Sequence, residues 1–561
     1  MDFKSKVVDL VASQVDLPKE KINQLIERPK NEKMGDYAFP AFTLAKVMHI
    51  NPAEIAQEIA ANLESSDFTS IQAVGPYVNF AINHEKLITQ ALHEVLTEKQ
   101  HYGDQKLGQG NVPIDMSSPN IAKPMSMGHL RSTVIGNSIA ETLKKVGYTP
   151  IKINHLGDYG TQFGKLISAY KHWGNEEDVK KDPIMNLFKY YVKFHEEAEK
   201  HPELEDEGRA WFKKLEDGDP EAVKLWQWFR DVSLKDFKRI YKELGVEFDS
   251  YKGEAFFNDK MQPVIDELKE KGLLHESRGA QVVDMGEDES PAMIVKSDGS
   301  SIYLTRDLAA AIYRMNTYHF VKMLYVVGNE QAHHFVELKT VLKKMGYDWA
   351  DEIYHVPFGL ITQNGKKLST RKGNVVFLDQ VLKDAVNLAR KQIDEKNPAL
   401  ANKEQVAHDV GVGAVVFHDL KNDRVENFDF DLDEVVRFEG DTGPYVQYTN
   451  ARAQSVLRKA AKLGQEPKLD AAPVKDDWSF SVAKALADFP RIIARSSDKF
   501  EPSVIAKYAL DLAKKFNKYY ANVKILIEDE QINTRLALVQ ATSIVLTEAL
   551  RLLGVNAPKE M

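Results

Sequence analysis

The fold is decided by residues 111–158, NVPIDMSSPNIAKPMSMGHLRSTVIGNSIAETLKKVGYTPIKINHLGD. Short apolar runs at 111–118 and 149–158 predict two strands. Between them, apolar residues at helical spacing from Leu130 to Val146 predict a helix that ends at Gly147. Strand, helix and strand in this order form a βαβ unit, whose parallel strands indicate an α/β sheet.

The turn before this helix is a candidate phosphate site. A strand end, a tight turn of small residues and a helix N-terminus bring backbone N–H groups and the positive end of a helix dipole together. Gly128 lets a ligand approach the backbone closely, and His129 can donate a hydrogen bond to a phosphoryl oxygen. In an open α/β sheet, this end of the strands is where ligands bind. By itself, a Gly-His pair at a helix start is equally compatible with a structural role.

A second polar loop, NGKKLSTRKGN, occupies residues 364–374. It combines basic and hydroxyl side chains between two glycines: Lys366, Lys367, Ser369, Thr370, Arg371 and Lys372. A cationic loop of this kind can close on a polyphosphate and neutralise the charge that develops in phosphoryl or nucleotidyl transfer. The loop alone could also be a solvated basic turn.

Composition narrows the class of protein. The 561 residues suggest three or four domains, and 43% hydrophobic and 28% charged residues are ordinary for a soluble globular chain. The absence of cysteine excludes disulfides, thiolate catalysis and cysteine zinc sites, and it fits a cytoplasmic location. No apolar run is long enough for a membrane span. The net charge is -9, but the segment from Asp441 onward carries 18 Lys and Arg against 14 Asp and Glu, which permits local contact with RNA.

The pattern along the chain predicts several domains. Residues 1–105 combine helices with the hairpin-like IQAVGPYVNFAI and end in a glycine-rich linker, and 106–375 carry the α/β pattern with a charged helical insertion at about 175–290. LITQNGKKLSTRKGNVVFLDQVLKDAV predicts strand, basic loop, strand and helix. Residues 376–435 connect to 436–561, which is helical throughout.

Together the two loops resemble the paired signatures of class I aminoacyl-tRNA synthetases. SMGH (126–129) is similar to the HIGH motif, with Ser126 at its first histidine, and KLSTR (367–371) is similar to KMSKS. SSPNIAKPM, NHLGDYGTQFGKL, YLTRDLAAA, KKLSTRKGNVV and DTGPYVQYTNARA narrow the resemblance to the arginyl-tRNA synthetases, from about residue 75 to the end of the chain.

The resemblance implies a multidomain fold. It comprises an N-terminal α+β domain for the tRNA elbow, a Rossmann-type catalytic domain with a helical insertion, a stem-contact region and a C-terminal all-α, DALR-type anticodon-binding bundle. It also implies a reaction in which ATP and L-arginine give arginyl-adenylate and pyrophosphate, and arginine then passes to the terminal adenosine of tRNA-Arg. The family needs bound tRNA for the first step, and many members act as monomers.

An arginine site can be read from the residues and from the resemblance. Tyr303 and Asp307 are four residues apart, so they share one face of a helical turn. A guanidinium prefers carboxylates and an aromatic face, and the family matches imply these roles for Tyr303, Asp307 and a second acid, Asp115. The resemblance adds ligands for the polar part of the amino acid, namely Ser117, Asn120 and Gln331. His333 and His334 follow closely, but we assign them a structural role.

The resemblance also implies ATP ligands. His129 and Gly128 should contact ATP, with Ser126 beside them, and Lys367 and Arg371 should clamp the phosphates with help from Lys366 and Ser369. His355, Phe358 and Gly359 stand where the family holds adenine. We expect Mg²⁺ to arrive with ATP, held largely by its phosphates, and we expect no protein-only metal site.

Contacts with tRNA should be spread over two further domains. Tyr77 and Asn79 offer a stacking face and an amide in VGPYVNF, the stretch that resembles the family's elbow-binding part. In the C-terminal bundle the candidates are Tyr445, Tyr448, Arg452 and the terminal APKEM.

Three alternatives remain open at the level of sequence. A cysteine-specific synthetase usually holds zinc with cysteines, which this chain lacks. A lysine-specific site is chemically closer, but a second acid at Asp115 favours the fork of arginine over a point charge. A catalytically silent RNA-binding paralogue is the third, because Ser126 departs from the signature.

Overall fold

A computed structural model describes residues 3–29, 31, 34–286, 289–297, 302–363, 366–367, 376–469 and 472–561. The chain divides into two compact units. The first comprises Met1–Tyr102, Arg452–Phe489 and Asp511–Leu546, and the second comprises Gly103–Ala451, Pro490–Leu510 and Thr547–Met561.

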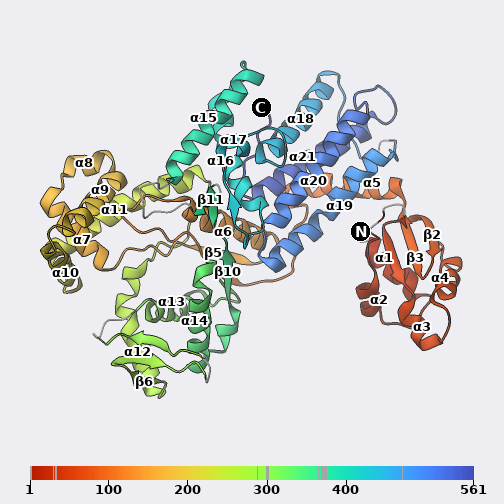
Figure 1. Cartoon of the computed structure of the whole chain (residues 1–561). Helices are drawn as coiled ribbons and strands as arrows, with labels where there is room; N and C mark the ends of the chain where they lie inside the picture. The colour runs from red at the N-terminus through yellow and green to blue at the C-terminus, as the bar shows by residue number, and fades with distance from the viewer. Residues whose placement is uncertain are drawn as a thin grey trace. The chain divides into compact units, whose positions relative to one another are not determined.

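The N-terminal domain, in the first unit, is a three-stranded antiparallel sheet with helices (Figure 1). Its elements are α1 (Phe3–Ala12), α2 (Lys19–Leu25), β1 (Tyr37–Pro40), α3 (Phe42–Met48), α4 (Pro52–Ala61), β2 (Phe68–Val74), β3 (Tyr77–Ile82) and α5 (His84–Glu98). The predicted hairpin is confirmed, since β2 pairs with β3 across a turn in which Gly75 has a positive φ of 57°. Phe39 of β1 and Phe80 of β3 are fully buried in the core that the helices cover.

The second unit is built around a four-stranded parallel sheet. Its strands are β4 (Asn111–Asp115), β5 (Thr149–Ile153), β9 (Met323–Gly328) and β10 (Ile353–Phe358), in the order β10-β9-β4-β5. The predicted βαβ unit is confirmed as β4, α6 (Met127–Lys145) and β5. Val112, Ile114, Leu324 and Val326 are buried, as expected for parallel strands that are covered on both faces.

The predicted insertion is mainly helical, and it also contains a small sheet that the sequence did not indicate. It follows α7 (Thr161–Trp173), and its helices, which Figure 1 draws mostly in orange and yellow, are α8 (Glu176–Lys181), α9 (Pro183–Ala198), α10 (Glu203–Glu216) and α11 (Pro220–Glu243). They are followed by η3 (Glu254–Lys260), α12 (Met261–Glu270) and the antiparallel strands β6 (Leu274–Ser277), β7 (Ala280–Val283) and β8 (Ala292–Val295).

The chain then returns to the central sheet. α13 (Tyr303–Tyr318) precedes β9, and η4 (Asn329–Gln331), α14 (Ala332–Lys344) and η5 (Asp348–Glu352) separate β9 from β10. One core joins α12, α13, α14 and β9 through residues such as Leu308, Met323 and Leu338.

The region after β10 is described in part. Its elements are β11 (Ile361–Gln363), β12 (Lys366–Lys367), α15 (Leu378–Lys396), α16 (Lys403–Lys421), β13 (Phe428–Asp429) and α17 (Leu432–Val435). The strand expected after the basic loop lies largely outside the described residues. In the described part, Phe377 forms a bridge with Ser126, and α15 begins at Leu378. The Leu378 N–H donates to the Met125 carbonyl at 2.9 Å, so the start of α15 lies beside the turn before α6.

The C-terminal part is helical, as predicted. It consists of α18 (Gly443–Lys462), α19 (Asp477–Lys499), α20 (Ser503–Asn522) and α21 (Ile532–Leu552). The terminal residues pack within the second unit, where Asn397 donates to the Met561 carbonyl at 3.2 Å. None of the helices that the structure describes is long and apolar enough to cross a membrane.

Candidate active site

The sheet order creates a crevice at the ends of β4 and β9. From β4 the chain passes through α6 to β5 on one side, whereas β9 lies on the other side of β4. Asp115, the last residue of β4, is paired with Tyr325 of β9. Strand order reverses at this point, and ligands of open α/β sheets bind outside the carboxyl ends of such strands. The predicted arginine ligands lie at or after the ends of these strands or in the first turns of helices nearby, whereas His355 and Phe358 lie on β10.

Ser126 and His129 form one unit at the start of α6. Ser126 precedes the helix with φ -100° and ψ 172°, and its backbone N–H donates to Nδ1 of His129 at 3.0 Å. A backbone N–H can only donate, so Nδ1 is the unprotonated ring nitrogen and Nε2 carries the proton. Burial lowers the pKa of His129 to about 4, so the ring is neutral near pH 7. The Ser126 hydroxyl lies 3.1 Å from the same Nδ1. Ser126 therefore orients His129.

Gly128 is exposed at the same turn. Among the described residues, a Cβ at this position would have only the Ser126 hydroxyl within 4 Å, at 3.6 Å. The described part of the protein therefore does not require a glycine here, and the lack of a side chain leaves room for a ligand at the helix N-terminus.

α13 presents the predicted arginine ligands on one face. Tyr303 begins the helix and its side chain is 72% exposed, and Asp307 follows one turn later. Asp307 Oδ2 lies 2.6 Å from Nε2 of His334, at the start of α14. Burial acts to raise the pKa of Asp307, but the hydrogen bond to His334 and the charges of His334, His155 and Arg314 together outweigh burial, so the pKa is lowered. Burial likewise acts to lower the pKa of His334, yet the hydrogen bond to Asp307 and the charges of Asp307 and Glu337 together raise it.

Asp115 has a partner within the protein. Its Oδ2 accepts from Nη2 of Arg314 at 2.7 Å, and both side chains are buried. Arg314 lies two turns after Asp307 on α13, 3.3 Å from Nδ1 of His155, and its guanidinium carbon is 5.4 Å from the centre of the Tyr325 ring. Asp307 is therefore the carboxylate that is more open to a ligand.

The remaining predicted arginine ligands differ in exposure. Gln331 is exposed at the end of β9, in η4. Asn120 is half-buried beside Gly157, where a Cβ would lie 2.1 Å from the Asn120 side-chain oxygen, so this approach needs glycine. Ser117 is fully buried, and its hydroxyl lies 2.8 Å from that of Tyr241.

The predicted adenine residues lie at the end of β10. His355 donates through Nε2 to the Val327 carbonyl at 3.0 Å and stacks on Phe335 at 4.5 Å, and burial lowers its pKa. Phe358 ends the strand, and Gly359 is buried. In the basic loop, Lys366 and Lys367 form β12, which is antiparallel to β11. Ser369, Thr370, Arg371 and Lys372 lie outside the described residues.

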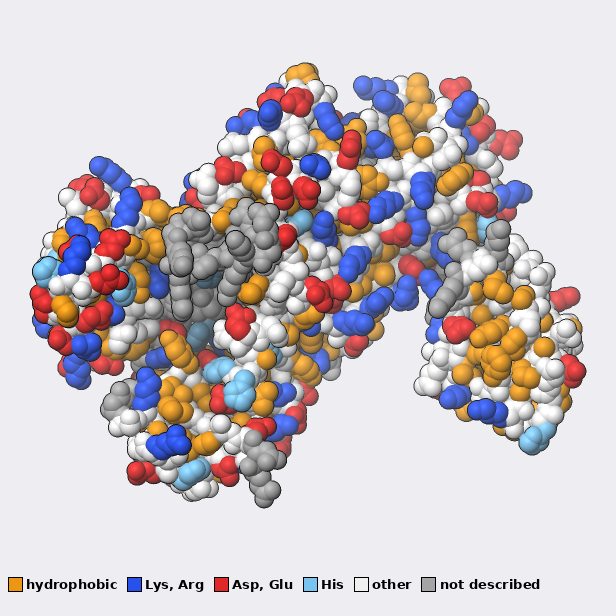
Figure 2. All heavy atoms as spheres, viewed as in Figure 1, with side chains coloured by type: hydrophobic (Ala, Val, Ile, Leu, Met, Phe, Trp, Pro, Cys, Tyr) orange, Lys and Arg blue, Asp and Glu red, His pale blue; other side chains and the backbone are white. Residues whose placement is uncertain are grey.

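The predicted elbow residues occupy β3 of the N-terminal domain. Tyr77 lies edge-on to Phe42, with ring centres 5.6 Å apart, and Asn79 is buried with a side-chain nitrogen that has no hydrogen-bond partner among the described residues. Exposed hydrophobic residues nearby in the sequence include Phe42, Met48 and Val74. Figure 2 shows hydrophobic side chains (orange) gathered over this domain.

Of the residues predicted for the C-terminal bundle, Tyr445, Tyr448 and Arg452 lie on α18, and the terminal APKEM follows α21. Tyr448 stacks on Phe438 at 6.1 Å, whereas Tyr445 is half-buried. Arg452 donates to the side chain of Asn517, and its guanidinium carbon lies 5.1 Å from the Tyr520 ring centre. These side chains therefore have contacts within the protein.

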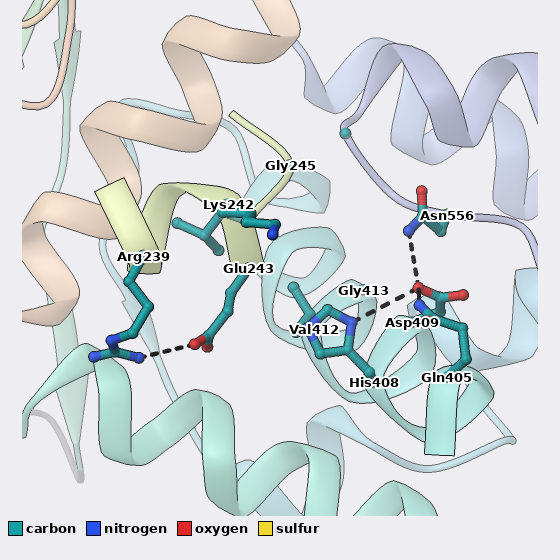
Figure 3. A pocket seen from close by; sticks show the side chains of 12 residues that line it. Arg239, Lys242, Glu243, Gly245, Gln405, His408, Asp409, Val412, Gly413 and Asn556 are labelled. Atoms are coloured by element: carbon teal, nitrogen blue, oxygen red, sulfur yellow. Dashed lines mark hydrogen bonds and ion pairs between the residues drawn. The ribbon is translucent and has the colours of Figure 1, made fainter. Parts of the chain in front are cut away.

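A separate cavity of about 470 Å³ lies between the end of α11, the first half of α16 and the C-terminal tail (Figure 3). Asp409 accepts there from Asn556 at 2.8 Å and from Gln405 at 3.0 Å. Of the described residues predicted for substrates, none lines this cavity. Within the described ranges, no group of three or more His, Asp or Glu side chains is placed to hold a metal ion.

Two residues of this geometry were missed by sequence reasoning. His334 was assigned a structural role, and Arg314 was not considered. The available signal for His334 was its position directly after the polar end of β9, where side chains face the crevice. Arg314 could have been found from its spacing of seven residues from Asp307, two helical turns along one face.

Three family models cover most of the chain. The model described as "tRNA synthetases class I (R), catalytic domain" matches residues 91–432. The model described as "Arginyl tRNA synthetase N terminal domain" matches residues 2–82, and that described as "DALR anticodon binding domain" matches residues 446–561.

Individual proteins give the same result. The arginine–tRNA ligase of Lactobacillus acidophilus is 84% identical over 561 residues, and that of Latilactobacillus sakei is 63% identical over 566; each match covers all of both chains. Among solved structures, Thermus thermophilus arginyl-tRNA synthetase matches with a TM-score of 0.82 at 26% identity. The match covers 100% of this chain and 100% of the Thermus chain. The Plasmodium falciparum enzyme, with a TM-score of 0.81 at 23% identity over 100% of this chain and 99% of its own, shows the shared fold.

Gly128→Ala tests whether the open turn serves a nucleotide. Alanine is the better helix former, so the free energy of unfolding should stay unchanged or rise slightly. ATP binding should weaken by about tenfold or more, which corresponds to about 1.4 kcal/mol. Thermal unfolding and ATP titration measure the two effects. Gly136→Ala is the matched control on α6: its Cβ would lie 2.5 Å from Met116, so stability should fall there. Unaltered ATP binding in Gly128→Ala would exclude close approach at this turn.

Proposed function

The chain belongs to the arginyl-tRNA synthetases of class I, and we propose the following roles for its residues in attaching arginine to tRNA-Arg at the expense of ATP. In the first step an arginine carboxylate oxygen attacks the α-phosphorus of ATP, and pyrophosphate leaves. The 2′-hydroxyl oxygen of the terminal adenosine of tRNA then attacks the carbonyl carbon of arginyl-adenylate, and AMP leaves.

The observation that carries these roles is the position of Asp307. It is a half-buried carboxylate at the crevice of the sheet, it shares a helix face with the exposed ring of Tyr303, and its pKa is lowered. A guanidinium can pair with the carboxylate while stacking on the ring. We propose that Asp307 and Tyr303 bind the arginine side chain in this way.

The other predicted arginine ligands are proposed for different roles, according to their contacts within the protein. Asn120 and Gln331 are proposed for the polar end of the amino acid. Asp115 is engaged by Arg314 through Oδ2, so its direct contribution falls to Oδ1, which has a contact of 3.4 Å with Ser118. Ser117 is buried against Tyr241, which favours a role in shaping the turn.

ATP is proposed to lie along the N-terminus of α6. The Nε2–H of His129 would donate to a phosphate oxygen, Gly128 would admit the phosphate to the backbone, and Ser126 would act by holding His129. His355, Phe358 and Gly359 are proposed for adenine. Lys366, Lys367, Ser369 and Arg371 are proposed to close over the phosphates together with the Mg²⁺ that arrives with ATP.

Recognition of tRNA is proposed for both ends of the chain. The unpartnered amide nitrogen of Asn79 supports base reading, and the ring of Tyr77 supports stacking. Tyr445, Tyr448 and Arg452 are proposed for the anticodon side. We also propose that activation needs tRNA: Tyr303 and Gln331 are open to solvent, so the terminal adenosine could complete the site.

The proposal extends to organisation. Residues 1–105 would bind the tRNA elbow, 106–375 would carry catalysis with the insertion at about 175–290, 376–435 would contact the stem, and 436–561 would bind the anticodon. We propose a monomer that works in the cytoplasm, where uncharged tRNA and ATP are available.

ATP–pyrophosphate exchange with each amino acid, with and without total tRNA, tests the reaction. We expect exchange with arginine alone among the amino acids, and only when tRNA is present. Exchange with lysine and not with arginine would identify lysine as the substrate. Exchange without tRNA would contradict the dependence on tRNA, and no exchange at all would favour a silent paralogue.

Asp307→Ala tests the arginine site. Loss of a charge-assisted pair of about 1.5–3 kcal/mol should raise the KM for arginine by roughly tenfold to a hundredfold, with little change in the KM for ATP. Steady-state exchange kinetics measure both constants. Asp379→Ala, which removes a half-buried carboxylate paired with Arg239, is the control for lost charge. An unchanged KM for arginine would remove Asp307 from the site.

The bond between His334 and Asp307 predicts a pH dependence. Protonated His334 competes with the substrate guanidinium for Asp307, and that bond raises the pKa of His334 above 6.5. The competition ends as the pH rises through this raised value, so the KM for arginine should fall. His334→Gln should flatten the profile because glutamine does not titrate. A profile that keeps its slope in this variant would argue against competition.

A further inference from the structure

Arg131 is a buried arginine two residues after His129 on α6. Its side chain is 1% exposed, and its Nε lies 3.2 Å from a carboxylate oxygen of Asp419 on α16. The guanidinium carbon lies 4.8 Å from the ring centre of Phe428 and 5.7 Å from that of Phe358. A charge this deep needs partners on all sides, because an unpaired buried ion is costly.

Those partners are mostly backbone carbonyls of other segments. Nη1 of Arg131 donates to the carbonyl of Gly359 at 2.7 Å and to that of Glu426 at 3.3 Å, and Nη2 donates to that of Arg424 at 3.3 Å. Gly359 fits because a Cβ there would lie 2.5 Å from the Glu426 carbonyl oxygen. The helix that carries His129 is thus bonded directly to the segment that leads into the basic loop.

Arg424 bonds the same segment to a further part of the chain. Its Nη1 donates to the Pro357 carbonyl at 2.7 Å, its Nε donates to the Phe500 carbonyl at 3.1 Å, and its own carbonyl accepts from the Gly359 N–H at 2.8 Å. Glu501 lies 3.7 Å from the same Nε. Gly359 is therefore bonded to α6 through Arg131, and Pro357 and Gly359 are linked through Arg424 to the turn between α19 and α20.

We propose that Arg131 and Arg424 are positioning residues for the nucleotide: they fix the path of residues 357–360, and through it the adenine side of the site relative to His129. Neither residue need touch ATP. The inference rests on the proposed function, because residues 355–359 and His129 are assigned to ATP there. We further infer that the turn at residues 500–501, between α19 and α20, helps to fix the position of the nucleotide site through Arg424.

The chemistry of the contacts favours positioning over general stability. Arginine carries five N–H donors in a rigid fork, so one side chain can fix several carbonyls at defined angles, which a lysine cannot do. The space between Arg131, Asp419, Arg424 and Glu501 holds no room for a water molecule. A shortened side chain would leave carbonyls of the segment without donors, and the segment would have to move to hydrate them.

The test is made on Arg424, which is half-buried, because removal of Arg131 endangers folding. In exchange assays with tRNA, Arg424→Gln should raise the KM for ATP about tenfold, since charge-assisted bonds to two carbonyls are lost. The KM for arginine should stay within about twofold, because α13 and α14 are not held by Arg424. Arg424→Lys, which can reach one carbonyl at a time, should give an intermediate KM for ATP.

Arg551→Gln is the matched control. Arg551 also forms ion pairs within the second unit, with Glu548 and Glu141, each at 2.7 Å. It should lower the melting temperature without changing the KM for ATP. An unchanged KM for ATP in both Arg424 variants would overturn the proposal. Equal increases in the KM for ATP and the KM for arginine, together with a loss of stability like that of Arg551→Gln, would also overturn it. A wild-type protein without arginine-dependent exchange would instead overturn the proposed function, and this inference with it.

Discussion

The parallel pairing of β4 with β9 is the constraint on which the site depends. Ile114 pairs with Leu324 and Asp115 with Tyr325 where the two halves of the sheet meet, although some two hundred residues separate the strands in the chain. This register brings the N-terminus of α6 and the start of α14 to one edge of the sheet. The helical insertion can therefore be long, because the site needs only that its two ends return to adjacent strands.

The sequence was sufficient for the fold class because its signals are local. The helix from Met127 to Lys145 and its flanking strands follow from apolar spacing and a glycine stop. The shared face of Tyr303 and Asp307 follows from helix geometry alone. The strand expected before Phe377 lies largely outside the described residues and stays a prediction.

Contacts between residues far apart in the chain are the features of the candidate site that could not be predicted from the sequence. His334 was assigned a structural role, yet its partner, Asp307, is 27 residues away on another helix. Ser126 departs from the HIGH motif, in which a histidine occupies this position. In the structure its backbone N–H determines which nitrogen of His129 carries the proton. Arg131 gave no signal, because an arginine in the first turns of a helix is usually exposed, and only the packed structure reveals its burial.

The partners of Arg131 and Arg424 have an evolutionary consequence. Both side chains recognise mainly carbonyl oxygens, which every residue possesses, so they constrain the path of the backbone and leave most side chains along it free to drift. Pro357 and Glu426 can therefore vary among descendants without loss of these bonds. Gly359 cannot, because any side chain there meets the Glu426 carbonyl. Selection at this junction should act on the donors and on one glycine, while neighbouring positions diverge.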